Sequence, residues 1–274
     1  MKPMRQDDIL ERIAELKRAG TAFAVATVVR TVRATAAKAG AKAVILPDGT
    51  VLAGWIGGGC ARGAVIRAAR EALADGAPRL ISVQPEEALA QGGLAPGETR
   101  DGIRFARNMC PSRGMMDIFV EAVMPAPECV ICGAAPVAVA LADLAPRMGF
   151  SVTACAPAEE QAAFAAPDRR IEGYALEVAP NGARYVVVAT QGKGDEAALR
   201  AALSVPSDYV AFVGSRAKTA ALRDRLTAAG VAPEAFANLR APAGLDLGAI
   251  TPEEIALSIL AEMVALRRAG QRGG

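Results

Sequence analysis

The second half of the chain alternates short apolar runs with longer segments of helical periodicity, and this alternation constrains the fold more than any other feature. The apolar runs have the length of buried strands, and a helical pattern follows each of them. Parallel strands need a crossover between them, so this order of elements predicts a doubly wound parallel sheet. We expect strands at 129–132, 151–155, 185–189 and 209–213, and helices at 137–148, 196–203, 217–229 and 252–268.

The first half of the chain has a different order of elements. Residues 6–19 have helical spacing, and the turn Pro47-Asp48-Gly49-Thr50 between two apolar runs indicates a β-hairpin. A helix is expected at 62–74, and 85–102 is expected to be a loop with at most a short helix. Further strands are expected at 23–29, 79–83, 103–107 and 115–123.

A proline-rich segment, Met124-Pro125-Ala126-Pro127-Glu128, separates the two patterns. It has no periodic apolar residues, so we place a domain boundary there. The expected fold class is α/β. We expect an N-terminal α/β domain at residues 1–124 and a C-terminal Rossmann-like domain, a doubly wound parallel sheet, at residues 128–274.

The composition excludes several classes of function. The 31 Lys and Arg residues nearly balance the 29 Asp and Glu residues, which leaves no basic surface for nucleic acid or anionic lipid. The first helix is charged throughout, and no uncharged apolar stretch reaches about 18 residues, so we expect no signal peptide, no membrane span and a cytoplasmic protein. In that compartment the five cysteines are expected to stay reduced.

The chain contains no histidine. This absence excludes the Ser-His-Asp triad, the Cys-His dyad and the histidine-containing zinc sites. Any chemistry must come from thiols, carboxylates, lysine, arginine or the backbone.

The segment Gly57-Gly58-Gly59-Cys60 is the sharpest local signal, because it joins a strand to a helix. Glycines let the backbone approach a ligand closely, and the N–H groups of a helix N-terminus favour an anion or oxo group. The same helix end would lower the pKa of Cys60 and favour a thiolate that binds soft metals. A tight turn with a buried small cysteine is the alternative interpretation, and the sequence leaves both open.

Two other groups of cysteines differ in their setting. Cys110 follows Asn108 in a polar loop, where a buried thiol is less expected, so a functional role is a reasonable hypothesis. Arg113 in the same loop would matter if it points toward Cys110, and a solvated arginine is the alternative. Cys129 and Cys132 are expected in the core, on opposite faces of a strand, because strand residues three apart point to opposite sides.

Residues 133–138, Gly-Ala-Ala-Pro-Val-Ala, stand where a dinucleotide-binding domain carries its glycine fingerprint. Only Gly133 matches that fingerprint. The methyl groups of Ala135 and Ala138 would obstruct a pyrophosphate and close helix packing. We therefore expect no NAD(P) binding by the usual route.

A later loop also follows a strand at the edge of the sheet where ligands usually bind. It contains Gly214 and Ser215, and Ser215 is expected to cap the next helix. Arg216 and Lys218 in the first turn are expected to face an anion, although exposed charges there need no ligand.

Several segments spread over nearly the whole chain share features with one protein family. They are Lys38-Ala-Gly-Ala-Lys-Ala43, Asp48-Gly49, Gly54-Trp-Ile-Gly-Gly-Gly-Cys60, Cys110-Pro-Ser-Arg-Gly114, Asp117-Ile-Phe-Val-Glu121, Gly244-Leu-Asp-Leu-Gly-Ala249 and Thr251-Pro-Glu-Glu-Ile-Ala256. In this order they resemble the XdhC/CoxF family, accessory proteins for xanthine dehydrogenase and carbon monoxide dehydrogenase.

The resemblance implies a molybdenum-cofactor (molybdopterin) chaperone rather than an enzyme. Such a protein holds the cofactor while a cysteine desulfurase or other sulfurtransferase installs a sulfido ligand, and it then passes the cofactor to a molybdenum hydroxylase apoenzyme. A homodimer is implied, and we expect the cofactor in a cleft between the domains. The expected cofactor-binding residues are Gly57, Gly58, Gly59, Cys60, Cys110, Arg113, Gly133, Gly214, Ser215 and Asp246, with Cys60 and Cys110 as metal ligands.

Further hypotheses concern the client enzyme and the class of function. The segment before the hairpin, with Trp55 and Cys110, points toward the carbon monoxide dehydrogenase branch, and a Cu(I)- or sulfur-handling pair of Cys60 and Cys110 extends that idea. Two alternatives stay open. One is an NAD(P)- or flavin-dependent oxidoreductase, and the other is a scaffold that docks a desulfurase to the apoenzyme without holding the cofactor.

Overall fold

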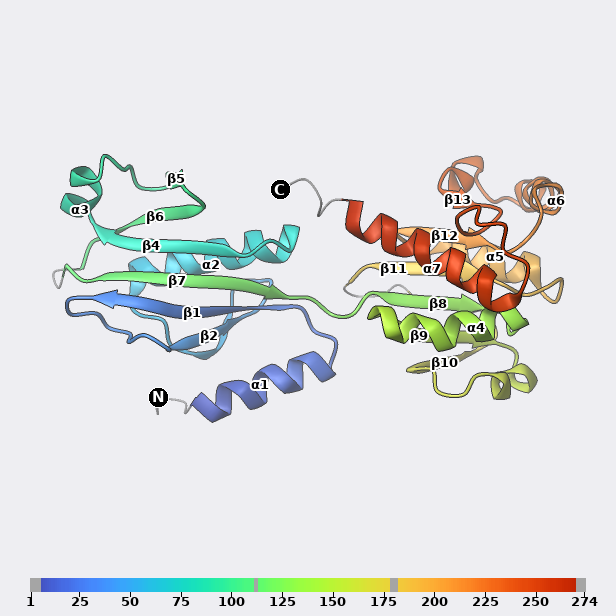
Figure 1. Cartoon of the computed structure of the whole chain (residues 1–274), viewed down its shortest axis with the longest axis horizontal. Helices are drawn as coiled ribbons and strands as arrows, with labels where there is room; N and C mark the ends of the chain where they lie inside the picture. Colours follow the sequence, from blue (N-terminus) through green and yellow to red (C-terminus); the bar gives the residue numbers. More distant parts are fainter. Residues whose placement is uncertain (1–5, 111–112, 178–181, 270–274) are drawn as a thin grey trace. The chain divides into compact units, whose positions relative to one another are not determined.

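The computed structural model describes residues 6–110, 113–177 and 182–269, apart from the side chains of Gln6, Asp7 and Cys60. The chain divides into two compact units (Figure 1). Unit 1 is Met1–Pro125 and unit 2 is Ala126–Gly274. The division falls inside the proline-rich segment that separates the two sequence patterns.

Unit 1 is a mixed sheet with the strand order β3-β2-β1-β7-β4-β6-β5. Antiparallel pairing joins β1 to β7 and β7 to β4, whereas β4 and β6 run parallel. The elements are α1 (Gln6–Arg18), β1 (Phe23–Val32), β2 (Lys42–Ile45), β3 (Val51–Gly54), α2 (Gly59–Asp75), β4 (Arg79–Pro85), α3 (Glu86–Gln91), β5 (Thr99–Arg100), β6 (Ile103–Asn108) and β7 (Met115–Val123).

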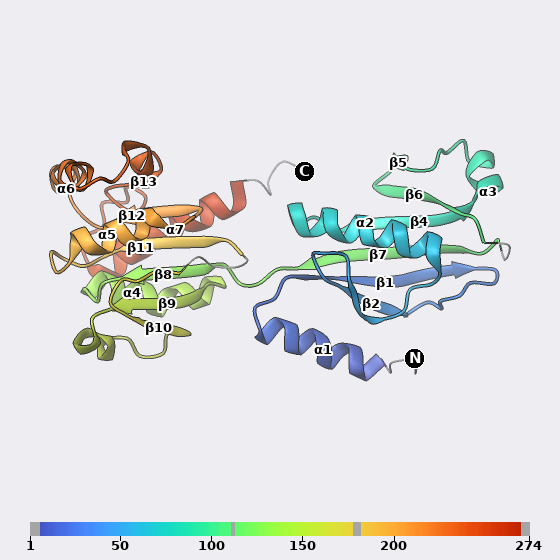
Figure 2. The same ribbon diagram turned by 180° about the vertical axis from the view of Figure 1, so that it is seen from behind.

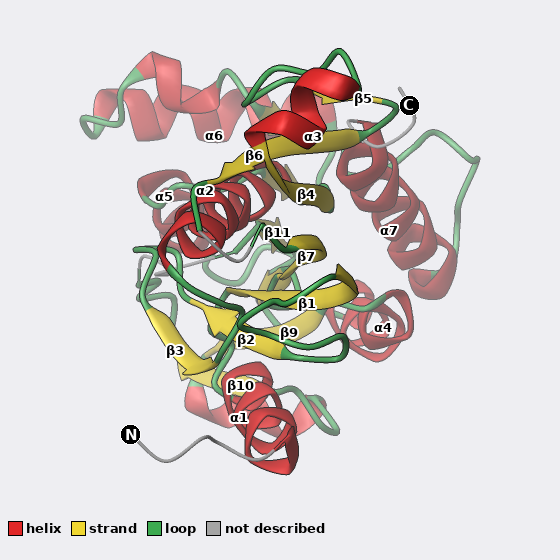
Figure 3. Cartoon of the chain, turned by 90° about the vertical axis from the view of Figure 1, so that its left-hand side faces the viewer, coloured by secondary structure: helices red, strands yellow, loops and turns green. Residues whose placement is uncertain are grey.

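The alternation of side chains along β1 explains why helices cover both faces of this sheet. Ala24, Ala26 and Val28 belong to the apolar cluster that includes α2, whereas Phe23 and Val25 belong to the cluster that includes α1. Successive strand residues point to opposite faces, so each face of β1 is buried by a different helix. Figure 3 shows α1 and α2 on opposite sides of β1 and β2.

Helix α2 contacts the sheet through small side chains. Its buried residues are Ala61, Val65, Ala68, Ala69 and Ala72. The helix was expected to begin at 62 but begins at Gly59, so Gly59 and Cys60 lie in its first turn rather than in a connecting loop.

The hairpin predicted from the turn at 47–50 is confirmed. Strands β2 and β3 are antiparallel, and the N–H of Thr50 donates a 2.8 Å hydrogen bond to Asp48 Oδ1. The segment 85–102, expected to be a loop with at most a short helix, contains α3 and the short strand β5.

Unit 2 is a parallel sheet with the order β10-β9-β8-β11-β12-β13. This is the strand order 3-2-1-4-5-6 of the Rossmann fold, so the predicted fold class is confirmed. Its elements are β8 (Glu128–Cys132), α4 (Pro136–Leu144), β9 (Ser151–Ala156), β10 (Arg169–Glu172), β11 (Arg184–Val188), α5 (Asp195–Ser204), β12 (Tyr209–Phe212), α6 (Arg216–Ala228), β13 (Leu239–Arg240) and α7 (Pro252–Ala269), with 3₁₀ turns at Ala145–Met148, Ala158–Ala163 and Pro233–Phe236.

The two edge strands of unit 2, β10 and β13, were not predicted. Strand β10 has the sequence Arg-Arg-Ile-Glu and is mostly exposed, and β13 is two residues long, so neither has an apolar run. The predicted helix at 137–148 ends at Leu144 and continues as a 3₁₀ turn that contains Pro146.

Helices cover both faces of the unit 2 sheet, as a doubly wound fold requires. Residues of α4 and α7 pack in one apolar cluster, and residues of α5 and α6 pack in the other. The capping box predicted for α7 is present: the Glu254 N–H donates to Thr251 Oγ1 at 3.3 Å and the Thr251 N–H donates to Glu254 Oε2 at 3.0 Å. Across the described ranges, no helix has both the length and the apolar character to cross a membrane.

The tight packing of α2 makes a testable prediction. Ala69 is fully buried against the sheet, whereas Ala74 on the same helix is exposed. We expect Ala69→Leu to lower the free energy of unfolding of unit 1 by about 1–3 kcal/mol, because the added atoms overpack the interface. Ala74→Leu is the matched control and should change it by less than about 0.5 kcal/mol. Urea denaturation of the full chain measures both, and equal effects would contradict close packing of α2.

Candidate functional site

The segment that leads from β3 into α2 is held by backbone contacts. At Gly54 the backbone has φ +83°, and a Cβ there would overlap Lys42 O. This close approach lets the Trp55 N–H donate to the same carbonyl at 2.9 Å. The Trp55 side chain is exposed, whereas Ile56 is buried and anchors the segment that follows.

The N-terminus of α2 presents backbone donors to open space. Gly58 is the N-cap residue and provides no side-chain hydrogen bond to the first turn. Gly58 and Gly59 are exposed, and no atom outside the local backbone lies within 4 Å of a Cβ placed on either. The first-turn N–H groups of a helix have no intrahelical partner, so these glycines leave room for an acceptor from a ligand. The side chain of Cys60 lies outside the described residues, so its predicted thiolate character stays a prediction.

The loop that contains Cys110 lies at the same end of the unit 1 sheet as the start of α2 (Figures 1 and 2). Gly57, just before α2, packs closely against the start of β7. Its φ is +111°, and a Cβ there would lie 3.2 Å from Met116 Cε. Asn108 closes the loop: its Nδ2 donates to Gly114 O at 2.7 Å and its Oδ1 accepts from the Cys110 N–H at 2.9 Å. Cys110 itself is exposed.

Arg113 has left-handed backbone geometry, with φ +51°. Its guanidinium lies 3.5 Å from a carboxylate oxygen of Glu87 on α3, and both side chains are more than half exposed. The geometry favours the solvated interpretation of this arginine, and its role beside Cys110 stays a prediction.

A hollow of about 360 Å³ adjoins the start of α2. It lies between α2 and β6, and Gly59 belongs to its lining. Its other lining residues are Gly63, Ala64, Arg67, Ile81, Pro96, Gly97, Arg104, Phe105, Ala106 and Arg107. The sequence analysis missed these arginines, because α2 and β6 are far apart in the chain and no local pattern joins them.

In unit 2, Gly133 lies at the carboxyl end of β8 and is required by the fold. Its φ is +101°, and a Cβ there would lie 2.6 Å from Ala189 O. The next residues provide few donors: the Ala135 N–H is directed at Ala189 O at 3.4 Å, and Pro136, the first residue of α4, has no N–H. A pyrophosphate normally binds to N–H groups at this helix end, so one of these donors is missing here and a second is directed at a carbonyl.

The other predicted residues of unit 2 have structural contacts. A Cβ on Gly214 would overlap the ring of Phe212, which explains the glycine. Ser215 Oγ accepts from the Lys218 N–H at 3.2 Å, so the predicted cap of α6 is confirmed. Asp246 is exposed in the loop before α7. Cofactor binding by these residues stays a prediction.

Lys218 was expected to face an external anion, but it pairs with a carboxylate of the same unit. Its Nζ lies 2.6 Å from Asp195 Oδ2, and Asp195 is buried at the start of α5. The Asp195 carboxylate also accepts from Thr190 Oγ1 and from the Gly192 N–H. These contacts tie the loops after β11 and β12 together. Asp195, the acidic residue directly after Gly194, is the sequence signal that could have predicted a partner for Lys218 within the same unit.

The prediction for Cys129 and Cys132 is confirmed: both are buried, in apolar clusters on opposite faces of the sheet. Cys132 lies beside Cys155, its register partner on β9. Their hydrogen bond, together with burial, raises the pKa of the Cys132 thiol, and burial raises the pKa of Cys129 to about 12. Among the described residues no group of three or more Cys, Asp or Glu side chains is arranged to hold a metal ion.

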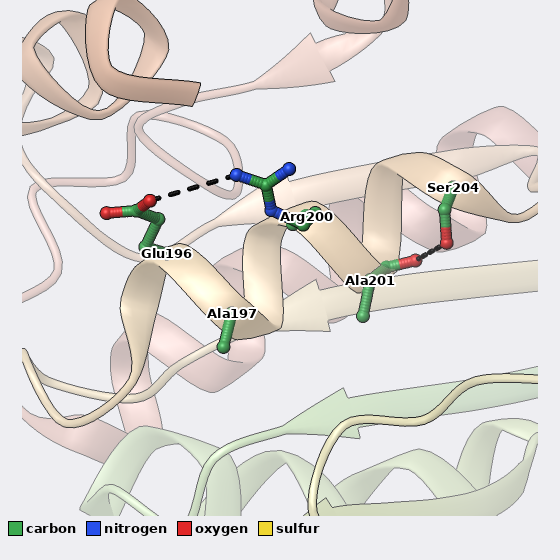
Figure 4. A pocket seen from close by; sticks show the side chains of 5 residues that line it. All are labelled: Glu196, Ala197, Arg200, Ala201 and Ser204. Atoms are coloured by element: carbon green, nitrogen blue, oxygen red, sulfur yellow. Dashed lines mark hydrogen bonds and ion pairs between the residues drawn. The ribbon is translucent and has the colours of Figure 1, made fainter. Parts of the chain in front are cut away.

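A second depression, of about 550 Å³, lies along α5 (Figure 4). Its lining residues all belong to that helix and include Glu196 and Arg200, which form an i,i+4 ion pair at 3.9 Å. The Ser204 hydroxyl donates to Ala201 O. This arrangement is the solvated face of a single helix, and we do not treat it as a functional site.

Burial of the unit 2 thiols predicts a labelling pattern. Thiol reagents attack the thiolate, and a raised pKa keeps Cys129 and Cys132 protonated at pH 8. We expect iodoacetamide to leave Cys129, Cys132 and Cys155 unmodified in the folded chain and to modify all three after unfolding. Peptide mass mapping measures this, with Cys110 as the exposed comparison. Modification of the three buried thiols before unfolding would contradict the described core.

The Asp195 ion pair predicts a pH dependence of stability. Burial acts to raise the pKa of Asp195, but hydrogen bonds from Lys218 and Thr190 outweigh burial and hold it below the ordinary 3.8. A carboxyl with a lowered pKa in the folded state stabilises the protein above its unfolded-state pKa, and this contribution is lost as the pH falls through the folded-state pKa. The stability difference between wild type and Asp195→Asn should therefore be largest above about pH 5 and shrink below pH 3.8. Chemical denaturation across this range measures it, and a stability difference that stays constant with pH would contradict the Asp195 ion pair.

Comparison with known proteins gives two family matches that together cover most of the chain. Residues 129–263 match the XdhC Rossmann domain, and residues 16–84 match the XdhC and CoxI family. The first match lies within unit 2 and the second within unit 1.

Similar proteins include two curated bacterial sequences. The uncharacterized protein YqeB of Escherichia coli is 29% identical over 270 residues, which are 95% of this chain and 46% of that protein. A protein of Bacillus subtilis described as a probable subunit of xanthine dehydrogenase is 30% identical over 164 residues, which are 56% of this chain and 46% of that protein. This chain thus spans about half the length of the curated relatives it matches.

A solved structure, described as a xanthine dehydrogenase from Bacillus halodurans, aligns over 97% of this chain and 96% of that chain, with 18% identity and a TM-score of 0.47. A likeness at this level carries no conclusion about function. One family match lies in each unit of the fold, and both agree with the motifs found in the sequence. This chain therefore belongs to the XdhC family.

Proposed function

We propose that this chain is an accessory protein that binds the molybdenum cofactor and holds it for the maturation of a molybdenum hydroxylase. Membership of the XdhC family supports the association with such an enzyme, and a relative described as a probable subunit of xanthine dehydrogenase favours the xanthine dehydrogenase type. Carbon monoxide dehydrogenase as the client has no comparable support. The apoenzyme, a sulfurtransferase and a second copy of the chain are the proposed partners.

The observation that carries this proposal is the open N-terminus of α2. The exposed residues Gly58 and Gly59 leave its first-turn N–H groups accessible, and no side chain caps them. Oxo groups and phosphate oxygens are strong acceptors, and the helix end adds partial positive charge. The residues present therefore fit a ligand rich in anionic oxygen.

Cys60 adds a soft ligand in the same turn. A thiolate binds soft metals, and a helix N-terminus favours the thiolate form. In this proposal the backbone donors orient the oxygen atoms of the cofactor while Cys60 contacts its metal, and Cys110 on the neighbouring loop is the second proposed ligand. The bound cofactor would supply the molybdenum that the client enzyme later uses, so this chain would perform no redox step itself.

The geometry of unit 2 supports an accessory role over a nicotinamide-dependent enzyme. Pro136 removes an N–H from the start of α4, and the Ala135 N–H is directed at a backbone carbonyl. A dinucleotide would have to bind without two of the donors at this helix end.

Pterin content tests the proposal. Wild type, Cys60→Ser and Gly59→Ala are purified from cells that make molybdopterin, and the oxidised fluorescent pterin is quantified together with molybdenum. We expect stoichiometric pterin in wild type and loss of molybdenum in Cys60→Ser. Gly59→Ala should fold, because no atom lies within 4 Å of the added methyl, but it should hold less pterin because the methyl crowds the donors.

Two outcomes would count against the proposal or part of it. Wild type without pterin, from cells shown to contain it, would favour the scaffold or the oxidoreductase. Normal molybdenum in Cys110→Ser would exclude Cys110 as a required ligand and leave the role of Cys60 intact.

A further inference from the structure

The hollow between α2 and β6 is lined by both cationic and apolar side chains. Arg67, Arg104 and Arg107 belong to its lining, and none of its described lining residues is acidic. Ala64 and Ile81 contribute apolar surface. A volume of about 360 Å³ lies within the range of small-molecule sites.

The three arginines differ in how firmly they are held. Arg104 donates to both carboxylate oxygens of Glu71 at 2.6 Å, and Arg107 lies 3.2 Å from Glu86. Arg67 has no ion pair or hydrogen bond of its side chain within the described part of the chain. Arg67 is therefore the cation in this hollow whose charge is not already matched by a carboxylate.

The hollow extends along α2 from the start of that helix. Gly59, Gly63 and Arg67 follow one another at four-residue intervals on α2, so they lie on one face of the helix. An anion held by Arg67 would lie two turns along that face from the exposed donors at Gly59. A ligand with an apolar or flat body and an anionic end would match the apolar side chains of the hollow and the charge of Arg67.

We propose that this hollow binds the phosphate end of a small organic phosphate monoester, with Arg67 as the main phosphate ligand and Arg104 as a wall of the site. Arginine donates two parallel hydrogen bonds to phosphate and keeps its charge at all physiological pH values. If the proposed function is correct, the monoester is the terminal phosphate of the pterin cofactor, and this part of the inference rests on that function.

The first experiment uses a probe that does not depend on the cofactor. Calorimetry compares 4-methylumbelliferyl phosphate with 4-methylumbelliferone, which lacks only the phosphate. We expect the full chain to bind the phosphate form more tightly, and Arg67→Met to weaken it about tenfold while leaving the weaker binding of the dephosphorylated probe unchanged.

Arg62→Met is the matched control, because Arg62 is an exposed arginine of α2 outside the hollow. It removes the same charge from the same helix and should leave the preference for phosphate intact. Equal loss in both variants would mean that general charge, not a site, attracts the probe. Unchanged binding in Arg67→Met would overturn the assignment outright.

A second measurement separates this inference from the proposed function. Arg67→Met, purified from cells that make molybdopterin, should retain less pterin than wild type and Arg62→Met. Equal, stoichiometric pterin in all three would overturn the assignment of the pterin phosphate to this hollow and leave the chaperone role standing. If wild type holds no pterin but shows the Arg67-dependent probe binding, the phosphate site stands and the proposed function fails.

Discussion

The close approach of α2 to the unit 1 sheet is the constraint on which the candidate site depends. Its contact surface is built from alanines and Val65, and small side chains let the helix axis lie near the strands. The start of the helix is therefore fixed relative to β7, where Gly57 meets Met116. The same packing sets the width of the hollow between α2 and β6, so a bulkier interface would alter the donors and the hollow together.

The fold could largely be predicted because its signals are local. The hairpin turn at 47–50, the capping box of α7 and the alternation of strands with helices each lie within a short window of sequence. The edge strands β10 and β13 escaped prediction because they bury little and carry no apolar run. The start of α2 was placed three residues late, because glycine disfavours a helix by propensity, whereas Gly59 and Cys60 belong to its first turn.

The candidate site was only partly predictable, and the reason is distance along the chain. Gly57 to Cys60 stand out in the sequence because consecutive glycines are costly to order. The partners that decide what an arginine or lysine does come from elsewhere in the chain: Glu71 pairs with Arg104, Asp195 pairs with Lys218, and Glu87 lies near the exposed Arg113. A sequence pattern shows which residues are charged but not which of them form ion pairs. Lys218 was therefore assigned to an external anion, and Arg67 was overlooked.

The start of α4 makes the requirements for pyrophosphate binding interdependent. In unit 2 the Rossmann architecture is intact while the turn after β8 combines a methyl group at Ala135 with a proline at 136. Replacing Pro136 alone would restore an N–H but leave the methyl in the path of a pyrophosphate, and Ala135→Gly alone would clear the path but leave the donor missing. Pyrophosphate binding by the usual route would therefore require at least two coordinated changes in this turn, one for the donor and one for the space that the ligand occupies.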